Sequence, residues 1–265
     1  MKTILTTTAF ALMASTALAD TITLYTSQPN ADAQQTVDAF KAANPDTDVE
    51  WVRDGTTKLM ARLRAEIEAG NPQPDVLLIA DTVTLEGMAQ EGLLTAYQSP
   101  EAANYDSALY SADGFYHSTK LITTGIVYNT GVETAPTSWN DLSDAALKGQ
   151  VAMPSPLYSG AALIHLATLT GDDSLGWGYY EQLAENDARA QGGNGGTFKA
   201  VASGEKPYGM VVDFLAIRNK AEGSPVEFVF PTEGVSYVTE PVAIMSTAKN
   251  VEGAQKFVDF LLSAE

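Results

Sequence analysis

Cysteine is absent from the sequence and histidine is scarce, with only His117 and His165 among 265 residues. Without thiols the chain has no disulfide, no cysteine-ligated metal site and no cysteine nucleophile. His165 falls in an apolar stretch typical of a packed helix, and His117 in a stretch typical of a loop or a strand edge. The G-x-S-x-G, H-E-x-x-H and P-loop motifs are also missing. We therefore expect no enzyme, no cofactor and no metal site, with a secreted carboxylate-based hydrolase as the alternative.

Basic side chains are few. Lysine and arginine together number 15 against 33 aspartates and glutamates, which gives a formal net charge of −18. An acidic surface repels nucleic acid and anionic lipid, so we expect no nucleic-acid partner. It does not exclude a small anionic ligand, because a pocket is governed by its own hydrogen-bond donors rather than by the total charge.

Hydrophobic runs long enough to cross a bilayer are missing as well. The N-terminus carries Lys2, a short apolar run at 9–13, and an A-x-A sequence at 17–19 ahead of Asp20. This pattern predicts a signal peptide at 1–19 that is cleaved on export. We therefore expect an exported protein.

Predicted strands and helices alternate along the rest of the chain. Strands are predicted at 21–26, 48–53, 75–80, 120–128, 150–153, 208–212, 226–230 and 237–245. Helices are predicted at 30–44, 56–67, 82–90, 139–147, 160–169, 173–186, 198–203, 214–222 and 254–262, with a glycine-rich loop at 192–197. This order is typical of an α/β protein with parallel strands and helices on both faces of each sheet. The apolar run at 75–80 indicates a strand buried on both sides.

Two loops carry hydroxyl side chains directly before helices. Ser159 stands where an N-cap belongs, ahead of the apolar run that starts at Gly160. Thr56 and Thr57 occupy a similar position after Gly55. A helix N-terminus with neighbouring hydroxyls binds anions, because its first N–H groups have no partner inside the helix. Ordinary capping is the alternative for each of these side chains.

Other polar side chains follow predicted strands at the edge where open α/β sheets bind ligands. Ser27 and Asp81 lie in the first half of the chain, and Ser155 and Asp213 in the second. Asp81 and Asp213 each precede a helix, so each is either its N-cap or a carboxylate that pairs with a cationic group of a ligand.

Seven short motifs in a fixed order connect the chain to a known family. They are LYTS at 24–27, GTTKL at 55–59, PDVL at 74–77, GIVYN at 125–129, SGAA at 159–162, VASGE at 201–205 and AQKFVDFLLS at 254–263. Each is weak alone, but the set spans nearly the whole chain after 19. The sequence resembles the periplasmic solute-binding proteins of ABC importers, in the branch that includes ferric-iron, polyamine, sugar-phosphate and 2-aminoethylphosphonate binders.

This resemblance implies a type 2 periplasmic-binding-protein fold with two α/β lobes, each a mostly parallel sheet flanked by helices, and a ligand cleft between them. Lobe 1 would comprise 20–123 and 236–265, and lobe 2 would comprise 124–235. Crossing strands near 125–128 and 237–243 would form the hinge. Family members usually continue past the last helix, so we expect a missing C-terminal segment. The partners would be a small-molecule ligand and a membrane permease, with the protein itself a monomer.

The ligand class is the harder question. Ferric-iron binders of this family usually carry adjacent tyrosines where this chain has Asp213 and Phe214, and often a histidine where it has Pro29. Fe³⁺ then lacks its usual donors. A polyamine binder would draw on carboxylates and aromatics such as Asp81, Asp213, Glu233 and Tyr237.

The hydroxyl-rich helix starts resemble a phosphonate clamp instead, and a zwitterion such as 2-aminoethylphosphonate would use both kinds of group. The hydroxyls that would hold its anion are those of Ser27, Thr56, Thr57, Ser155 and Ser159, together with the Gly160 backbone and the Tyr237 phenol. Asp213 or Asp81 would pair with its ammonium group.

Overall fold

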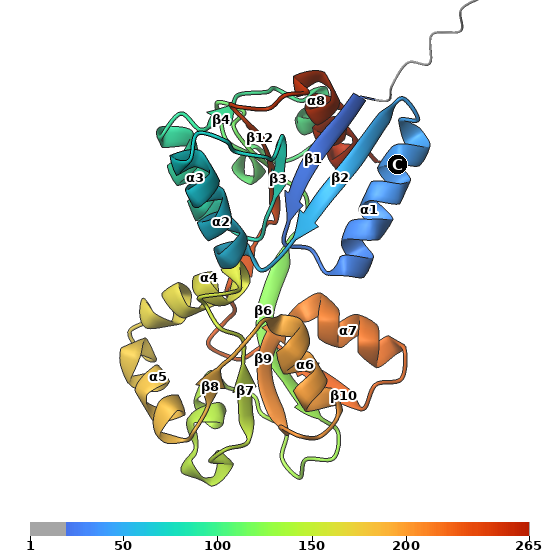
Figure 1. Ribbon diagram of the computed structural model, residues 1–265. Coiled ribbons are helices and arrows are strands. Elements are labelled where there is room, and N and C mark those ends of the chain that lie inside the picture. Colours follow the sequence, from blue (N-terminus) through green and yellow to red (C-terminus); the bar gives the residue numbers. More distant parts are fainter. Residues whose placement is uncertain (1–19, 265) are drawn as a thin grey trace, which may run out of the picture.

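The chain folds into two lobes, each built of one sheet and the helices that cover it, which we call lobe 1 and lobe 2 (Figure 1). A computed structural model describes residues 20–264, so the predicted signal peptide at 1–19 lies outside the described residues. Within that part of the chain, no helix is long and apolar enough to cross a membrane. The expected two-lobed α/β architecture is confirmed.

Lobe 1 holds both ends of the described chain. Its sheet has the order β2-β1-β3-β12-β4, with β5 paired to β12. The strands are β1 (Asp20–Thr26), β2 (Thr47–Arg53), β3 (Val76–Leu78), β4 (Leu94–Thr95), β5 (His117–Ser118) and β12 (Pro241–Met245). The helices are α1 (Asn30–Ala43), α2 (Thr56–Glu68), α3 (Thr82–Gln90) and α8 (Val251–Leu262), with short 3₁₀ helices η1 (Pro100–Asn104) and η2 (Ser107–Leu109).

Both faces of the lobe 1 sheet are covered. Val76 and Leu78 pack with Phe40 of α1 and Phe257 of α8, whereas Leu77 packs on the opposite face with residues of α2 and α3. All three β3 side chains are fully buried. The apolar run at 75–80 therefore behaves as predicted, because a strand covered on both sides has no polar face to present.

Lobe 2 is built on a sheet of order β10-β6-β9-β7-β8, with β11 paired to β6. The strands are β6 (Ile122–Asn129), β7 (Val151–Met153), β8 (Arg189–Ala190), β9 (Tyr208–Val212), β10 (Val226–Val229) and β11 (Tyr237–Val238). The helices are α4 (Gly160–Thr170), α5 (Gly176–Glu185), α6 (Asn194–Ala202) and α7 (Asp213–Ala221), with the 3₁₀ helices η3 (Trp139–Ser143) and η4 (Ala145–Leu147).

The sheets are mixed rather than mostly parallel. In lobe 1, β2 and β3 run parallel to β1, but β12 runs antiparallel to β3, β4 and β5. In lobe 2, β6 runs antiparallel to β9, β10 and β11, and β7 runs parallel to β8 and β9. The strands that run against their neighbours are β6, through which the chain enters lobe 2, and β12, through which it returns to lobe 1.

Three local predictions were wrong in detail. The helix expected at 139–147 is two 3₁₀ turns, because Asp144 is extended (φ −60°, ψ 132°) and caps the second of them. The glycine-rich stretch at 192–197 is mostly the first turn of α6. The strand expected at 237–245 is broken between β11 and β12, where Glu240 adopts a positive φ of 41°.

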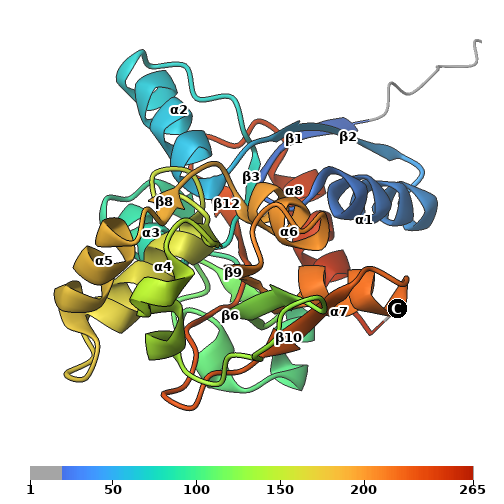
Figure 2. The same ribbon diagram turned by 90° about the horizontal axis from the view of Figure 1, so that it is seen from below.

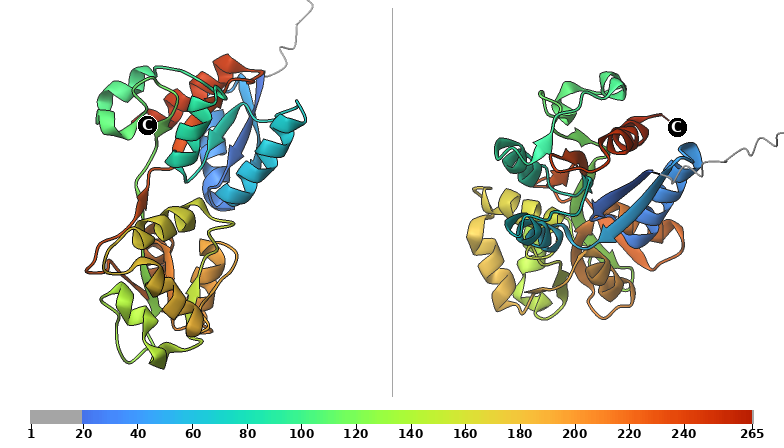
Figure 3. Two further views of the ribbon diagram at one scale, coloured as in Figure 1. Left: turned by 90° about the vertical axis from the view of Figure 1, so that its left-hand side faces the viewer. Right: turned by 45° about the horizontal axis from the view of Figure 1, so that its top comes forward.

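Two segments of chain connect the lobes, one after β5 and one after β11, and they run together along one side of the molecule (Figure 3). The N–H groups of Thr119 and Lys120 both donate to the Thr239 carbonyl, at 3.2 Å each. The break at Glu240 therefore falls where the chain leaves one sheet and joins the other.

The lobes also touch each other away from these connections, where α4 of lobe 2 lies below α2 of lobe 1 (Figures 1 and 2). The Thr57 N–H donates to the Tyr158 carbonyl at 3.2 Å. A Cβ added to Gly160 would lie 2.6 Å from the Ala80 carbonyl oxygen, so the α4 start meets lobe 1 without room for a side chain. On the opposite side, Arg218 of α7 pairs with Asp32 of α1 through two bonds of 3.0 and 3.2 Å.

The Phe40–Phe257 contact offers a test of the lobe 1 core. The rings meet edge to face at 4.9 Å and both are fully buried. Phe257→Ala should lower the free energy of unfolding by about 3–5 kcal/mol, because it removes buried surface and leaves a cavity. Urea unfolding followed by circular dichroism measures the change. Val251→Ala, on an exposed position of the same helix, should change the value by less than about 1 kcal/mol; equal losses in the two variants would contradict this account.

Candidate ligand-binding site

A cavity of about 330 Å³ lies where the two lobes and their connecting segments meet. Lobe 1 lines it with Ser27, Pro29, Arg53, Gly55, Thr56 and Ala80. Lobe 2 lines it with Ile122, Tyr158, Ser159, Ala161, residues 192–196, Val212, Phe214 and Leu215, and the connection between β11 and β12 adds Glu240. Binding pockets commonly occupy such a position between domains.

Three helices begin at the wall of this cavity. Thr56 is the first residue of α2, Ser159 caps α4, and Asn194 is the first residue of α6. The first N–H groups of each helix have no carbonyl partner inside that helix, and each N-terminus carries a partial positive charge. Their convergence from both lobes makes the cavity a favourable place for an anion.

The Ser159 hydroxyl is arranged to donate a hydrogen bond. Its Oγ accepts from the Ala162 N–H at 3.3 Å and from the Asn194 side chain at 3.1 Å. A hydroxyl has two acceptor positions and one proton, so these two bonds leave the proton for a third partner. Asn194 is itself fixed, because its Oδ1 accepts from the Val212 N–H at 3.1 Å.

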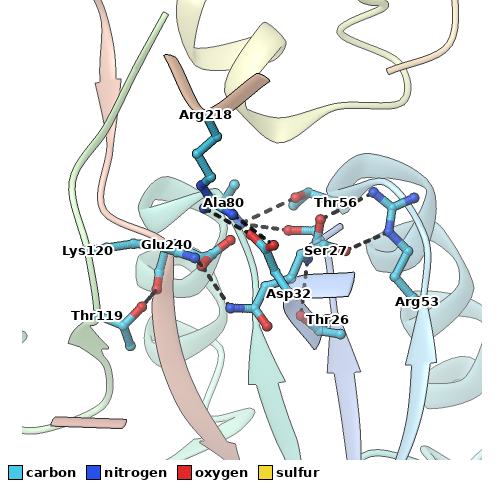
Figure 4. A network of polar contacts seen from close by, with 11 residues as sticks. Thr26, Ser27, Asp32, Arg53, Thr56, Ala80, Thr119, Lys120, Arg218 and Glu240 are labelled. Atoms are coloured by element: carbon cyan, nitrogen blue, oxygen red, sulfur yellow. Dashed lines mark hydrogen bonds and ion pairs between the residues drawn. The ribbon is translucent and has the colours of Figure 1, made fainter. Parts of the chain in front are cut away.

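Lobe 1 contributes two hydroxyls in the same manner. The Ala80 N–H donates to Ser27 Oγ at 3.0 Å and to Thr56 Oγ1 at 3.3 Å (Figure 4). Both side chains line the cavity, and Thr56 is almost fully buried. These bonds occupy an acceptor position on each oxygen and hold the loops after β1 and β3 against the start of α2.

Arg53 supplies a full positive charge, and reasoning from the sequence missed it. It is the last residue of β2, and its Nε donates to the Gln28 carbonyl at 2.7 Å. One terminal nitrogen contacts the Ser27 carbonyl at 3.5 Å (Figure 4), and the other contacts Tyr158 Oη at 3.1 Å. A guanidinium carries five N–H bonds, so two remain beyond these contacts. The available signal was a basic residue at the end of a strand, one position before the loop that was singled out.

Glu240 is the second residue that the sequence did not reveal. Its side chain is buried beside the hinge, where Oε2 accepts from Lys120 at 2.6 Å and from Gln28 at 3.2 Å (Figure 4). Burial raises the pKa of this carboxyl, and the contacts with Lys120 and Gln28 act in the opposite direction. Because both bonds go to Oε2, the other carboxylate oxygen retains capacity to accept a hydrogen bond.

The predicted site residues fall into two groups. Ser27, Thr56 and Ser159 line the cavity. Gly160 lies next to it against lobe 1, and Thr57 contributes to the contact between lobes, donating its hydroxyl to the Pro156 carbonyl at 3.0 Å. Ser155 is not among the lining residues, and its Oγ accepts from the Leu157 N–H at 3.2 Å.

The structure does not bring the predicted carboxylates or the phenol into the cavity wall. Asp81 caps α3, accepting from the Thr84 N–H at 3.1 Å. Asp213 accepts from the Thr123 hydroxyl at 2.6 Å and from the Thr123 N–H at 3.1 Å. Tyr237 is 61% exposed on β11. None of the three lines the cavity.

The histidines also lie outside the cavity wall. His165 is buried, with Nδ1 3.0 Å from Ser236 Oγ, and burial lowers its pKa to about 3. Within residues 20–264, no group of three or more histidine, aspartate or glutamate side chains is placed to hold a metal ion.

Comparison with known proteins agrees with this geometry. The model of the bacterial extracellular solute-binding protein family matches residues 25–265. A probable ABC transporter periplasmic-binding protein, y4fP of Sinorhizobium fredii, is 26% identical over 265 residues, covering 94% of this chain and 71% of its own length. A putative 2-aminoethylphosphonate-binding periplasmic protein of Salmonella typhimurium is 28% identical over 241 residues, covering 86% of this chain and 68% of its own length.

A solved structure shares the two-lobed arrangement. The periplasmic binding protein AfuA from Actinobacillus pleuropneumoniae, with exogenous fructose-6-phosphate bound, superposes with a TM-score of 0.82 at 28% identity, over 92% of this chain and 79% of that one. The expected type 2 periplasmic-binding-protein fold is therefore confirmed. The family match spans nearly all of the described residues, and the chain belongs to the bacterial extracellular solute-binding proteins, the ligand-capturing subunits of ABC transporters.

Proposed function

We propose that this protein captures a small organophosphonate, 2-aminoethylphosphonate first, in the periplasm and delivers it to a membrane permease. The observation that carries the proposal is the convergence of Arg53 with the starts of α2, α4 and α6 on one cavity. A phosphonate has three oxygens and up to two negative charges, so it can accept hydrogen bonds from both lobes at once.

The anion would lie among donors of several kinds. The Ser159 proton and the first N–H groups of α4 and α6 face it from lobe 2. The remaining N–H bonds of Arg53 and the start of α2 face it from lobe 1. Arg53 suits this role because its planar fork can donate two parallel bonds to one oxyanion.

The ammonium group would pair with Glu240 rather than with Asp81 or Asp213. Glu240 is the one carboxylate among the lining residues, whereas the other two are held by Thr84 and Thr123. Its second oxygen is the acceptor that remains after Lys120 and Gln28 are satisfied. The contact with Lys120 favours the charged form of the carboxylate, which an ammonium ligand requires, against the burial that raises its pKa.

The other ligand classes fit these lining residues less well. A ferric ion prefers several anionic donors, and Tyr158 is the only phenol in the cavity wall. A polyamine needs several carboxylates, and Glu240 is the only one there. A sugar phosphate would use the same oxyanion site, and the fructose-6-phosphate bound to AfuA makes it the second candidate.

Calorimetric titration of the protein from residue 20 onward tests the proposal directly. 2-Aminoethylphosphonate should bind with one site per chain and a dissociation constant in the micromolar range or tighter. Fructose 6-phosphate, inorganic phosphate, spermidine and Fe³⁺ are titrated in parallel. Heat with spermidine or Fe³⁺ alone would overturn the oxyanion site, and heat with fructose 6-phosphate alone would overturn the phosphonate assignment. Recovery of unchanged 2-aminoethylphosphonate distinguishes binding from hydrolysis.

A second titration tests the role of Glu240. Glu240→Gln should reduce the preference for 2-aminoethylphosphonate over ethylphosphonate by about tenfold or more, because it removes the charge that pairs with the ammonium group. The matched variant Asp213→Asn should leave this preference unchanged, since that carboxylate is bonded to Thr123. A loss of preference in Asp213→Asn but not in Glu240→Gln would show instead that Asp213 pairs with the ammonium group.

A further inference from the structure

Tyr158 connects lobe 2 to lobe 1 through its carbonyl, its ring and its hydroxyl. Its carbonyl oxygen accepts from the Thr57 N–H at 3.2 Å. Its hydroxyl oxygen accepts from Arg53 Nη1 at 3.1 Å. It lies directly before Ser159, so the same turn of chain carries the tyrosine and the hydroxyl that caps α4.

The ring of Tyr158 fits between two glycines, one from each lobe. A Cβ added to Gly55 would lie 2.6 Å from ring atoms of Tyr158, and one added to Gly193 would lie 2.8 Å from the ring. Both distances are below any normal carbon contact, so the ring occupies the space where a side chain would stand. Gly55 and Gly193 are the N-caps of α2 and α6. The ring therefore lies between the starts of two helices that border the cavity.

The hydroxyl of Tyr158 has a second partner in lobe 1. Burial acts to raise the pKa of the Asp54 carboxyl, but hydrogen bonds from Lys58, from the Gly55 N–H and from Tyr158 outweigh it and lower that pKa. Asp54 is also paired with Lys58 at 2.9 Å. A Tyr158 proton bonded to Asp54 would leave an oxygen lone pair for Arg53, whose Nη1 donates to this oxygen.

We propose that Tyr158 is a positioning residue, which orients the Arg53 guanidinium toward the cavity only when the lobes are closed. Arg53 is held from its own lobe by two carbonyls, of Gln28 and Ser27, and the second of these contacts is long at 3.5 Å. The bond to Tyr158 comes from the opposite lobe, so it forms on closure and fixes the outer end of the guanidinium. Recognition of an oxyanion by Arg53 is in this way coupled to closure of the lobes.

This inference rests on the proposed function in one respect, that Arg53 receives an oxyanion of the ligand. Removing the Tyr158 hydroxyl should then loosen Arg53 without removing its charge. The bound ligand should leave faster, because the closed state loses a bond that the open state does not have. The ligand-free protein should be equally stable, because it need not hold the two lobes together.

Tyr158→Phe is the variant that isolates the hydroxyl, since it keeps the ring between Gly55 and Gly193. We expect binding of 2-aminoethylphosphonate to weaken by about tenfold, which is typical for the loss of a hydrogen bond to a charged group. Stopped-flow measurement should assign the change to faster dissociation, and the thermal unfolding midpoint without ligand should not change. Tyr237→Phe, which removes an exposed phenol outside the cavity, is the matched control and should bind normally.

A double-mutant cycle with Arg53→Gln shows whether Tyr158 acts through Arg53. If it does, Tyr158→Phe has almost no further effect once the guanidinium is gone. A full additional loss in the Arg53→Gln background, or affinity within twofold of wild type for Tyr158→Phe alone, would overturn the positioning role while leaving the proposed function intact. A wild-type protein that binds neither phosphonate nor sugar phosphate would overturn both.

Discussion

The N–H groups at helix starts, which need partners from outside the regular hydrogen bonding of the helix, are the constraint around which this structure is arranged. A helix cannot satisfy its own first four N–H groups, and here the starts of α2, α4 and α6 face one cavity. Gathering positive helix ends and Arg53 in one place is unfavourable until an anion enters. The contacts between the lobes, including the approach of Gly160 to the Ala80 carbonyl that leaves no room for a side chain, keep these donors together. An oxyanion bound there, as we propose, would make the closed arrangement favourable.

Much of the fold follows from sequence patterns, because alternating strands and helices with a fully apolar β3 admit few other arrangements. Ser159 and Thr56 could be identified, since helix capping is a local rule that a short segment reveals. Asp213 shows the limit of that rule. Its position at the start of α7 looks the same in the sequence whether it binds a ligand or, as here, accepts from Thr123, ninety positions earlier in the chain.

Arg53 and Glu240 escaped notice for related reasons. Arg53 completes a strand, and only the arrangement of β2 beside β1 shows that its side chain reaches Gln28 and the cavity. Glu240 stands in a stretch that looks like one continuous strand, and its positive φ exists because the chain changes sheets there. Neither feature is encoded by neighbouring residues alone. The strongly negative net charge of the chain does not predict the positive charge of Arg53 at the cavity, because surface charges are screened over about 8–10 Å at ordinary salt concentrations.

The pair between Arg218 and Asp32 spans the lobes on the side opposite Tyr158, but it is largely open to solvent on the arginine side. Such a pair contributes at most about 1 kcal/mol and weakens as salt is added. A pair of this strength can bias the hinge toward closure without locking it. A transport protein must also release its ligand. Because the Arg218–Asp32 pair is weakened by salt and by competing charges, a charged surface on the membrane partner could separate the two residues and so favour reopening of the lobes.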